Sequence, residues 1–372
     1  MDPEARVAVG ERTGPLHRLI TAGILSDIRG GRLPAGEPIP SPRRICERYD
    51  CSSTTARRVL FELHRAGIAE RRVGIGTFVA PTALLKRIAL VVMDHAHALP
   101  IVSAHCGELL GGVGEASWRH HCQVTVAYPR NRSELAAWLG DVRRHDLADG
   151  MVVRASGGLD HEESTLLEAT GLPVVVVKRH LTGGGLFGVV VDERASARLA
   201  VEHLCELGHR RVGFVSAQPE SYVCRERLAG YRAALGARGI PYAGALVRLG
   251  KAFAPQEGCH AVADLWRAER PTAIVIASVD MALGAYTAAR EAGLAIQQDL
   301  SLAAVDDIPQ ATELHPPLTT VSTAHADLGR AAVERLVDVI DARWQGRAPA
   351  PCSRVLPPLL RLRGSSAPPA GP

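Results

Sequence analysis

The segment CSSTTARRVL, residues 51–60, places four hydroxyl side chains shortly before a pair of arginines, and an apolar run follows. Hydroxyls, backbone N–H groups and guanidinium groups are the donors that proteins present to phosphates and base edges of DNA. Ser52 or Ser53 can cap a helix that starts here, and the N-terminal end of a helix favours an anion. The segment therefore predicts a nucleic-acid contact at the start of a helix.

Three helices and a hairpin are predicted around this segment. Ser41 can cap a helix with Pro42 in its first position, and the next helix starts at the hydroxyl segment and closes at Gly67. A hairpin follows around Gly74–Gly76. An earlier helix, ended by Gly30–Gly31, is indicated by apolar residues at four-residue spacing, namely Leu16, Ile20, Ile24 and Ile28. This order predicts a winged helix-turn-helix whose third helix enters the major groove.

Net positive charge is confined to the first quarter of the chain. Residues 1–86 hold 14 basic and 9 acidic residues, a net charge of +5, whereas the remainder holds 29 and 30, a net charge of −1. A small basic domain on a near-neutral body favours contact with a polyanion. The alternative is a basic surface that is only solvated, and charge alone does not separate the two.

The string LPAGEPIPSPRRICERYDCSSTTARRVLFELHRAGIAERRVGIGTFV resembles the GntR family of bacterial regulators, and the resemblance covers residues 14–80. It implies a winged helix that binds double-stranded operator DNA. Many members carry arginine where this chain has Ser53, which implies a different operator base at that position. A winged helix used for protein contacts is the alternative. The resemblance, with three neighbours on the same helices (Arg44, Ser53 and Arg58), gives as predicted DNA contacts Ser41, Arg43, Arg44, Ser52, Ser53, Thr54, Thr55, Arg57, Arg58 and Gly74.

From Arg87 onward, apolar strand-like runs alternate with helical stretches, for example PVVVVK and ASARLAVEHLCELG. This alternation predicts an α/β fold with parallel sheets and helices on both faces. The length suggests two similar lobes, with a ligand site in the cleft at the carboxyl ends of the strands. The expected organisation is a flexible N-terminus at 1–13, a winged helix at 14–80, a linker at 81–86, a two-lobed domain at 87–362 and a flexible tail at 363–372.

Several motifs in this part resemble the effector-binding domain of the LacI/GalR repressors, which is related to periplasmic sugar-binding proteins. They are VVVDERASARLAVEHLCELGHRRVGFV, RERLAGYRAAL, PTAIVIASVDMALGAYTAAREAGL and SLAAVDDIPQATELHPPLTTV. The resemblance implies the fused architecture of arabinose-repressor-like regulators and three chain crossings between the lobes. It assigns residues 87–190 and 297–325 to one lobe, and residues 191–296 with the C-terminal helix to the other.

The same resemblance places a small-molecule effector between the lobes. RERLAGY keeps the family's arginine as Arg227, for which a surface ion pair with Glu226 is the alternative. The family's Asn-Asp before MALG is replaced, so that strand alternation would put Val279 in the pocket. For the Asp306–Asp307 pair, a structural capping role is favoured over ligand contact. The predicted effector contacts are Asp94, His95, Lys178, Arg179, Arg227, Val279, Asp280 and Asp306.

The predicted pocket has lost acidic groups and gained basic ones relative to the family. Lys178–Arg179 stand where the family often has Asp-Arg, and Arg227 lies in the same predicted site. We therefore hypothesise an anionic effector, such as a sugar acid or sugar phosphate, beside the neutral sugars that the family implies. The alternative is that Lys178 points to solvent and that the pocket has diverged.

Several histidines and cysteines are metal ligands by type, but their spacings match no zinc signature, and we predict no metal and no cofactor. The residues weighed are His95, His97, His105, Cys106, His120, His121 and Cys122. GxSxG, HExxH and GK[ST] motifs are missing, so we do not expect an enzyme. We expect a cytoplasmic protein from the lack of a signal pattern and a homodimer from the symmetry of such regulators, and the family resemblance implies a repressor. A binding protein without a DNA role and a regulator without an effector are the alternatives.

Overall fold

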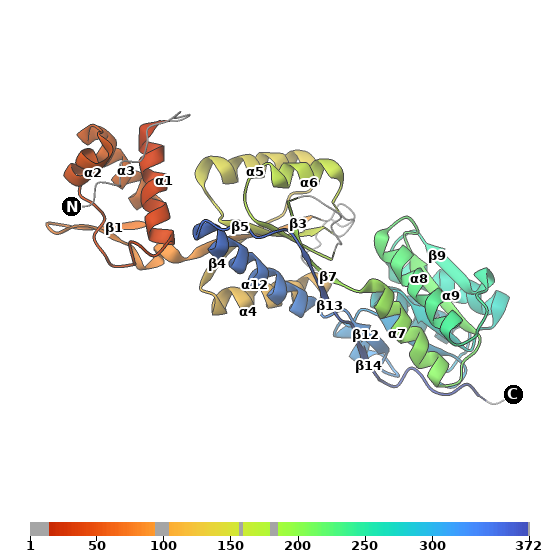
Figure 1. The fold of residues 1–372 in the computed structure, drawn as a ribbon. Coiled ribbons are helices and arrows are strands. Elements are labelled where there is room, and N and C mark those ends of the chain that lie inside the picture. The colour runs from red at the N-terminus through yellow and green to blue at the C-terminus, as the bar shows by residue number, and fades with distance from the viewer. Residues whose placement is uncertain (1–14, 94–103, 156–158, 179–184, 371–372) are drawn as a thin grey trace. The chain divides into compact units, whose positions relative to one another are not determined.

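The computed structural model describes residues 15–93, 104–155, 159–178 and 185–370 (Figure 1). The expected flexible N-terminus at 1–13 lies outside the described residues. The chain divides into two compact units. Among the described residues, the first unit contains 15–88, 121–123 and 337–350, and the second unit contains the others.

The N-terminal elements confirm the predicted winged helix-turn-helix. Helix α1 buries the predicted isoleucine face, and Ser41 and Ser52 are the caps of the next two helices. Strands β1 and β2 pair antiparallel around Gly74–Gly76, with Ala69 opposite Val79. The bounds are α1 Leu16–Arg29, α2 Pro42–Tyr49, α3 Ser53–Arg65, β1 Ala69–Arg72 and β2 Gly76–Val79.

Residues expected to form a linker pack against this domain instead. A 3-10 turn, η1, spans Pro81–Leu84, and Ala83 is buried in the same apolar cluster as the isoleucines of α1. Strand β3 then begins at Lys86, so that little chain remains between the winged helix and the next sheet.

Two six-stranded sheets form the lobes of the remaining chain. The first has the order β13-β7-β6-β5-β3-β4 and carries α5 and α6 on one face and α4 and α12 on the other (Figure 1). Its strands are β3 Lys86–Met93, β4 Cys122–Ala127, β5 Gly150–Ala155, β6 Val174–Val177, β7 Phe187–Val191 and β13 Ser353–Leu356. Its helices are α4 Ala104–Arg119, α5 Arg132–His145, α6 His161–Glu168 and α12 His325–Trp344.

The second sheet has the order β14-β12-β11-β10-β8-β9, and only β14 runs antiparallel to its neighbour among the strand pairs described in it. Helices α7 and α8 pack on one face of this sheet, and α9 and α10 on the other. The strands are β8 Val212–Ala217, β9 Val247–Gly250, β10 Ala273–Ile276, β11 Ser301–Val305, β12 Thr319–Ser322 and β14 Leu359–Arg361. The helices are α7 Glu193–Glu206, α8 Tyr222–Ala237, α9 Pro255–Glu269, α10 Val279–Glu291, the short α11 Gln310–Glu313 and the 3-10 turn η3 Gly244–Leu246.

The predicted assignment of segments to lobes is wrong in two places. Strand β11 pairs directly with β10, so residues 297–325 belong mainly to the second lobe. Helix α12 packs closely on α4 of the first lobe, where a Cβ on Gly112 would lie 1.9 Å from the carbonyl oxygen of Ala326. The three predicted crossings are confirmed, because the chain changes sheet after β7, after β12 and after β13.

The C-terminal residues are not the flexible tail that their composition suggested, at least as far as residue 370. The Ser365 hydroxyl is fully buried, donates to the carbonyl of Leu302 at 2.7 Å and accepts from the Thr319 amide at 2.8 Å. The Ala367 amide donates to the Ser301 hydroxyl at 3.0 Å. These bonds hold the C-terminal segment along the second lobe.

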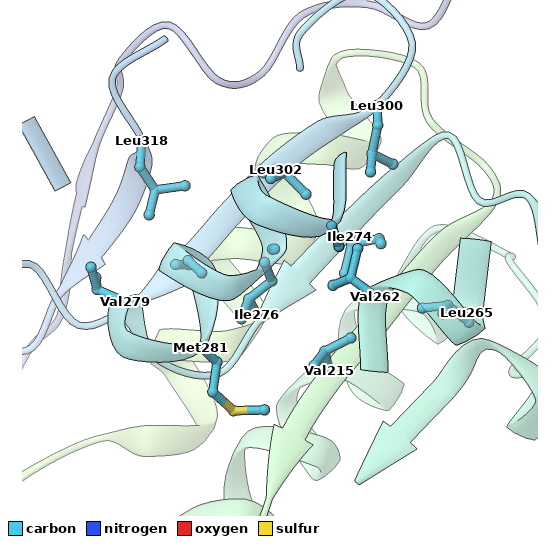
Figure 2. Packing of buried hydrophobic residues seen from close by; sticks show 14 of the residues in the cluster. Val215, Val262, Leu265, Ile274, Ile276, Val279, Met281, Leu300, Leu302 and Leu318 are labelled. Atoms are coloured by element: carbon cyan, nitrogen blue, oxygen red, sulfur yellow. The ribbon is translucent and has the colours of Figure 1, made fainter. Parts of the chain in front are cut away.

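The core of the second lobe corrects one predicted effector contact. Val279 begins helix α10 and lies with Ile276, Met281 and Leu318 in the apolar cluster of Figure 2, with no exposed surface. Strand alternation does not apply to it, because β10 ends at Ile276 and Ser278 is already the helix cap. Val279 is therefore a core residue, and it does not face a ligand.

Candidate DNA interface and effector pocket

The start of α3 presents hydroxyl groups and the first turn of the helix to solvent. Ser52 caps the helix by accepting from the Thr55 amide at 3.1 Å, and the two hydroxyls lie 2.9 Å apart. Ser53 and Thr54 are exposed in the first turn. This end of the helix can donate hydrogen bonds to an anion.

Two predicted DNA-contacting arginines carry ion pairs within their own helices. Arg43 lies 2.9 Å from Glu47, and Arg58 lies 3.2 Å from Glu62. Exposed pairs of this kind contribute about 0.3–0.5 kcal/mol, so a DNA phosphate can replace the carboxylate at little cost. The four-residue spacing of these pairs was visible in the sequence and was missed.

The wing ends in a glycine and two exposed apolar side chains. Gly74 has a φ of +77°, a left-handed conformation that favours glycine. Val73 and Ile75 beside it are 92% and 75% exposed. The sequence reasoning named only Gly74, and the apolar tip adds a surface that can contact a groove or a partner.

In the second lobe, the side chain of Arg227 of α8 is buried and contacts several polar groups. It is not the surface residue paired with Glu226 that was the alternative interpretation. Its side chain is 2% exposed, lies 2.7 Å from the carboxylate of Glu193 and donates to the carbonyl of Ala277. Both Nη atoms also lie 3.4 Å from Oδ2 of Asp306. Glu226 instead pairs with Arg194 on the surface. Glu193, which the sequence reasoning missed, is the partner that keeps Arg227 in place.

Asp306 contacts both Arg227 of the second lobe and Lys178 of the first lobe. It follows β11 with a φ of +70°, and its Oδ1 accepts from the Thr323 hydroxyl at 2.5 Å. Burial alone would raise the pKa of Asp306, but Arg227 and Lys178 together hold it well below its usual value. The carboxylate of Asp306 thus has a basic partner in each lobe, Arg227 in the second and Lys178 in the first. Its neighbour Asp307 has the structural role, because it pairs with Arg363 at 2.8 Å.

Lys178 reaches Asp306 from the other lobe. It follows β6 with a φ of +66°, and its Nζ lies 3.8 Å from Oδ1 of Asp306. Burial lowers the pKa of Lys178, and Asp306 partly restores it. The side chain is 25% exposed and faces the cluster, so the reading in which it points to bulk solvent is not favoured.

Two imidazole rings complete the cluster. His105 of α4 and His325, the first residue of α12, have ring centroids 4.7 Å apart. Burial lowers the pKa of each, strongly for His325. His325 is 2% exposed and was not singled out from the sequence, although it starts a helix directly after a crossing between the lobes. One ring nitrogen of each, with an oxygen of Asp306, forms the group that could hold a metal ion among the described residues.

The structure brings together Lys178, Arg227 and Asp306 of the predicted effector contacts. Asp280 is half-buried in the first turn of α10 and contributes to the electrostatic environment of His105. Asp94, His95 and Arg179 lie outside the described residues, as does His97. His120 and His121 lie between α4 and β4, and Cys122 begins β4.

A winged helix with an exposed, donor-rich recognition helix, followed by two lobes with a charged cluster at their strand ends, defines a ligand-responsive DNA-binding regulator. Comparison of the chain with known protein families supports this class of protein. The family model of gntR bacterial regulatory proteins matches residues 17–79, and that of the periplasmic binding protein-like domain matches 201–366. Among the described residues, no helix is both long and apolar enough to cross a membrane.

Relatives by sequence and similar solved structures are also transcription regulators. The ribose operon repressor of Haemophilus influenzae is 32% identical over 234 residues, which are 63% of this chain and 70% of that protein. The structure of the CelR–cellobiose complex has a TM-score of 0.66 at 25% identity and covers 95% of this chain and 99% of that one. A LacI-family regulatory protein from Chloroflexus aggregans has a TM-score of 0.66 at 28% identity, covering 74% and 98%. The chain belongs to the LacI family of transcription regulators, with a GntR-type winged helix at its N-terminus, and its relatives are regulators and not enzymes.

Proposed function

We propose that this regulator is a cytoplasmic, homodimeric repressor that binds a palindromic operator through its winged helices. The two-fold symmetry of a dimer matches two half-sites in one DNA duplex. The support is the exposed hydroxyl and guanidinium groups on α2, α3 and the wing. The proposed contacts are Ser41, Arg43, Arg44, Ser52, Ser53, Thr54, Thr55, Arg57, Arg58 and Gly74.

The effector is proposed to be a small carbohydrate held at the cluster around Asp306. The observation that carries this proposal is the meeting of Arg227 and Asp306 of the second lobe with Lys178 of the first. Lys178 and Asp306 both follow the carboxyl end of a parallel strand, which is where ligands bind in open parallel sheets. CelR, which is similar over nearly the whole chain, binds cellobiose in its solved structure.

The charges of the cluster favour a neutral sugar over the anion first hypothesised. Glu193 offsets Arg227, and Asp306 offsets Lys178, so these four side chains together have no net charge. Hydroxyl groups of a sugar can donate to the carboxylates and accept from the cations. A sugar acid or sugar phosphate is the second candidate, favoured by Arg154, which lies near enough to act on both Lys178 and His105.

Ligand binding would change how the lobes are held. The Lys178–Asp306 ion pair joins the two lobes at the cluster, and a ligand that takes over Asp306 removes that contact. A ligand shifts an equilibrium only by its different affinity for the two states. The proposed effector therefore changes operator affinity by replacing an inter-lobe ion pair with its own contacts.

Fluorescence anisotropy of labelled operator DNA tests the effector class. The protein bound to its upstream DNA would be titrated with neutral sugars, sugar acids and sugar phosphates. We expect a response to a neutral sugar that needs a different ligand concentration in Lys178→Met. The matched control is Lys251→Met, because Lys251 is an exposed lysine of the second lobe. A response limited to anionic ligands would contradict the neutral-sugar proposal, and an unchanged Lys178→Met response would remove Lys178 from the site.

A further inference from the structure

Three side chains in the cluster have the composition of a transition-metal site. His105 comes from α4, Asp306 follows β11, and His325 begins α12. One ligand atom of each lies within 4.8 Å of the other two. Two imidazoles and one carboxylate are a donor set that zinc and similar divalent ions accept, and three protein ligands leave positions open for water or a ligand oxygen.

Two nitrogens in this group are buried without a hydrogen-bond partner among the described residues, although Nε2 of His105 lies 3.9 Å from Oδ2 of Asp306. Nε2 of His105 and Nε2 of His325 make no hydrogen bond with any described residue. A buried polar atom without a partner costs about 1–3 kcal/mol, so its presence calls for a physical reason. A metal ion coordinated by both nitrogens would supply the missing interaction.

The other nitrogen of His325 is already oriented. Its Nδ1 lies 3.3 Å from the hydroxyl of Thr323 and 3.8 Å from the carboxylate of Glu108. Metal-binding histidines are commonly held in this way, with the second ring nitrogen facing a carboxylate or another acceptor. The arrangement leaves Nε2 as the nitrogen available to an ion.

Lys178 is the competitor for this site. Its ammonium lies 3.8 Å from Asp306, which is too long for a hydrogen bond, and its side chain is partly exposed. Arg227 also contacts Asp306, but it is fixed by Glu193 and its charge is offset there. An ammonium and a divalent cation repel each other strongly beside one carboxylate, so that a metal ion would require Lys178 to move away.

We infer that His105, Asp306 and His325 form a binding site for a zinc-like divalent metal ion, and that this ion competes with Lys178 for Asp306. This replaces the expectation, made from sequence spacing, that the chain has no metal site. Two ligands come from the first lobe and one from the second, so the ion would join the lobes. The inference does not depend on the proposed sugar effector.

The test is direct metal binding by the full-length protein without a histidine tag. Protein treated with a chelator and dialysed is titrated with Zn²⁺ by calorimetry and with Co²⁺ by visible absorption. We expect one ion per chain, loss of binding in His325→Ala and in Asp306→Asn, and an affinity about 10-fold to 100-fold lower in Glu108→Gln. His260→Ala, which removes an exposed histidine of α9, is the control and should bind as the wild type does.

A second variant separates loss of the site from loss of the fold. Lys178→Met removes the competing cation and keeps all three ligands, so we expect tighter Zn²⁺ binding, by at least about 10-fold. Circular dichroism would show whether each variant is folded. Absence of stoichiometric binding, binding that survives in folded His325→Ala and Asp306→Asn, or unchanged affinity in Lys178→Met would overturn the inference. Operator binding and sugar response of the metal-free protein, measured separately, report on the proposed function alone.

Discussion

Arg227 and Arg194 offer a test of what burial does to an ion pair within one pair of helices. Arg227 of α8 pairs with Glu193 of α7, and both side chains are 2% exposed. Arg194 of α7 pairs with Glu226 of α8, and the arginine is 57% exposed. Helices α7 and α8 therefore carry two pairs of the same chemistry, one buried and one at the surface.

We predict that Arg227→Met lowers the free energy of unfolding of the second lobe by about 3–5 kcal/mol, because it leaves Glu193 buried without its cation. The slope of the unfolding free energy with urea is about 2 kcal/mol per M for a unit of this size, so the midpoint falls by about 1.5–2.5 M. Arg194→Met should cost at most about 1 kcal/mol. The Arg227→Met/Glu193→Gln double variant should recover a large part of the loss, since no buried charge of the pair remains unpaired.

The assay is urea unfolding followed by far-ultraviolet circular dichroism, with the four proteins compared under one set of conditions. Equal and small losses for Arg227→Met and Arg194→Met would refute the reasoning, because burial would then make no difference. Additive losses in the double variant would show that Arg227 and Glu193 do not stabilise the fold as a pair.

Three further perturbations address the capping of α3, helix packing and pH. Ser52→Ala removes the cap of α3, so it should lower the free energy of unfolding by about 1 kcal/mol and weaken operator binding. Ser52→Asp keeps a cap but places a negative charge where it repels phosphate, so it should weaken operator binding alone. Thermal unfolding measures the change in stability, and anisotropy measures the change in operator affinity. Gly258→Ala places a Cβ 2.0 Å from the carbonyl oxygen of Met281, so it should lower the free energy of unfolding in urea by about 1–3 kcal/mol. In the control Gly236→Ala, the new Cβ meets no atom within 4 Å, so the protein should not be destabilised. Burial lowers the pKa of His209 below its usual 6.5, so the unfolded chain takes up a proton first as the pH falls. The unfolding free energy should therefore fall as the pH drops below 6.5, and His209→Gln should make that fall smaller; an unchanged pH profile would contradict the assignment.

The winged helix could be predicted closely because its signals are local. Ser41 and Ser52 cap helices by contacts within three residues, Pro42 occupies the first position of α2, and Gly74 closes a short hairpin. Neither the helix caps nor the turn glycine depends on distant parts of the chain. Element types in the lobes were predictable for the same reason, from continuous apolar runs in buried parallel strands.

The errors arise where distant segments decide the outcome. No local signal shows that α12 packs on α4 or that Ser365 binds the backbone of β11. His105, Asp306 and His325 are up to 220 positions apart and meet only because three elements converge, so spacing rules could not find them. Arg227 was found from the family motif, but its partner Glu193 lies on another helix and has no sequence signal of its own.

The central claim is that the N-terminal domain binds operator DNA through α3, and the most direct measurement is anisotropy of a labelled duplex from the region upstream of the gene. The dissociation constant would be measured at several salt concentrations for the wild type and for Arg57→Ala. We predict that the logarithm of the association constant falls steeply and linearly with the logarithm of the salt concentration. Because Arg57 is proposed to contact a phosphate, the slope should become smaller by about 1 in Arg57→Ala. No binding at low salt, or an affinity that salt does not change, would contradict the account.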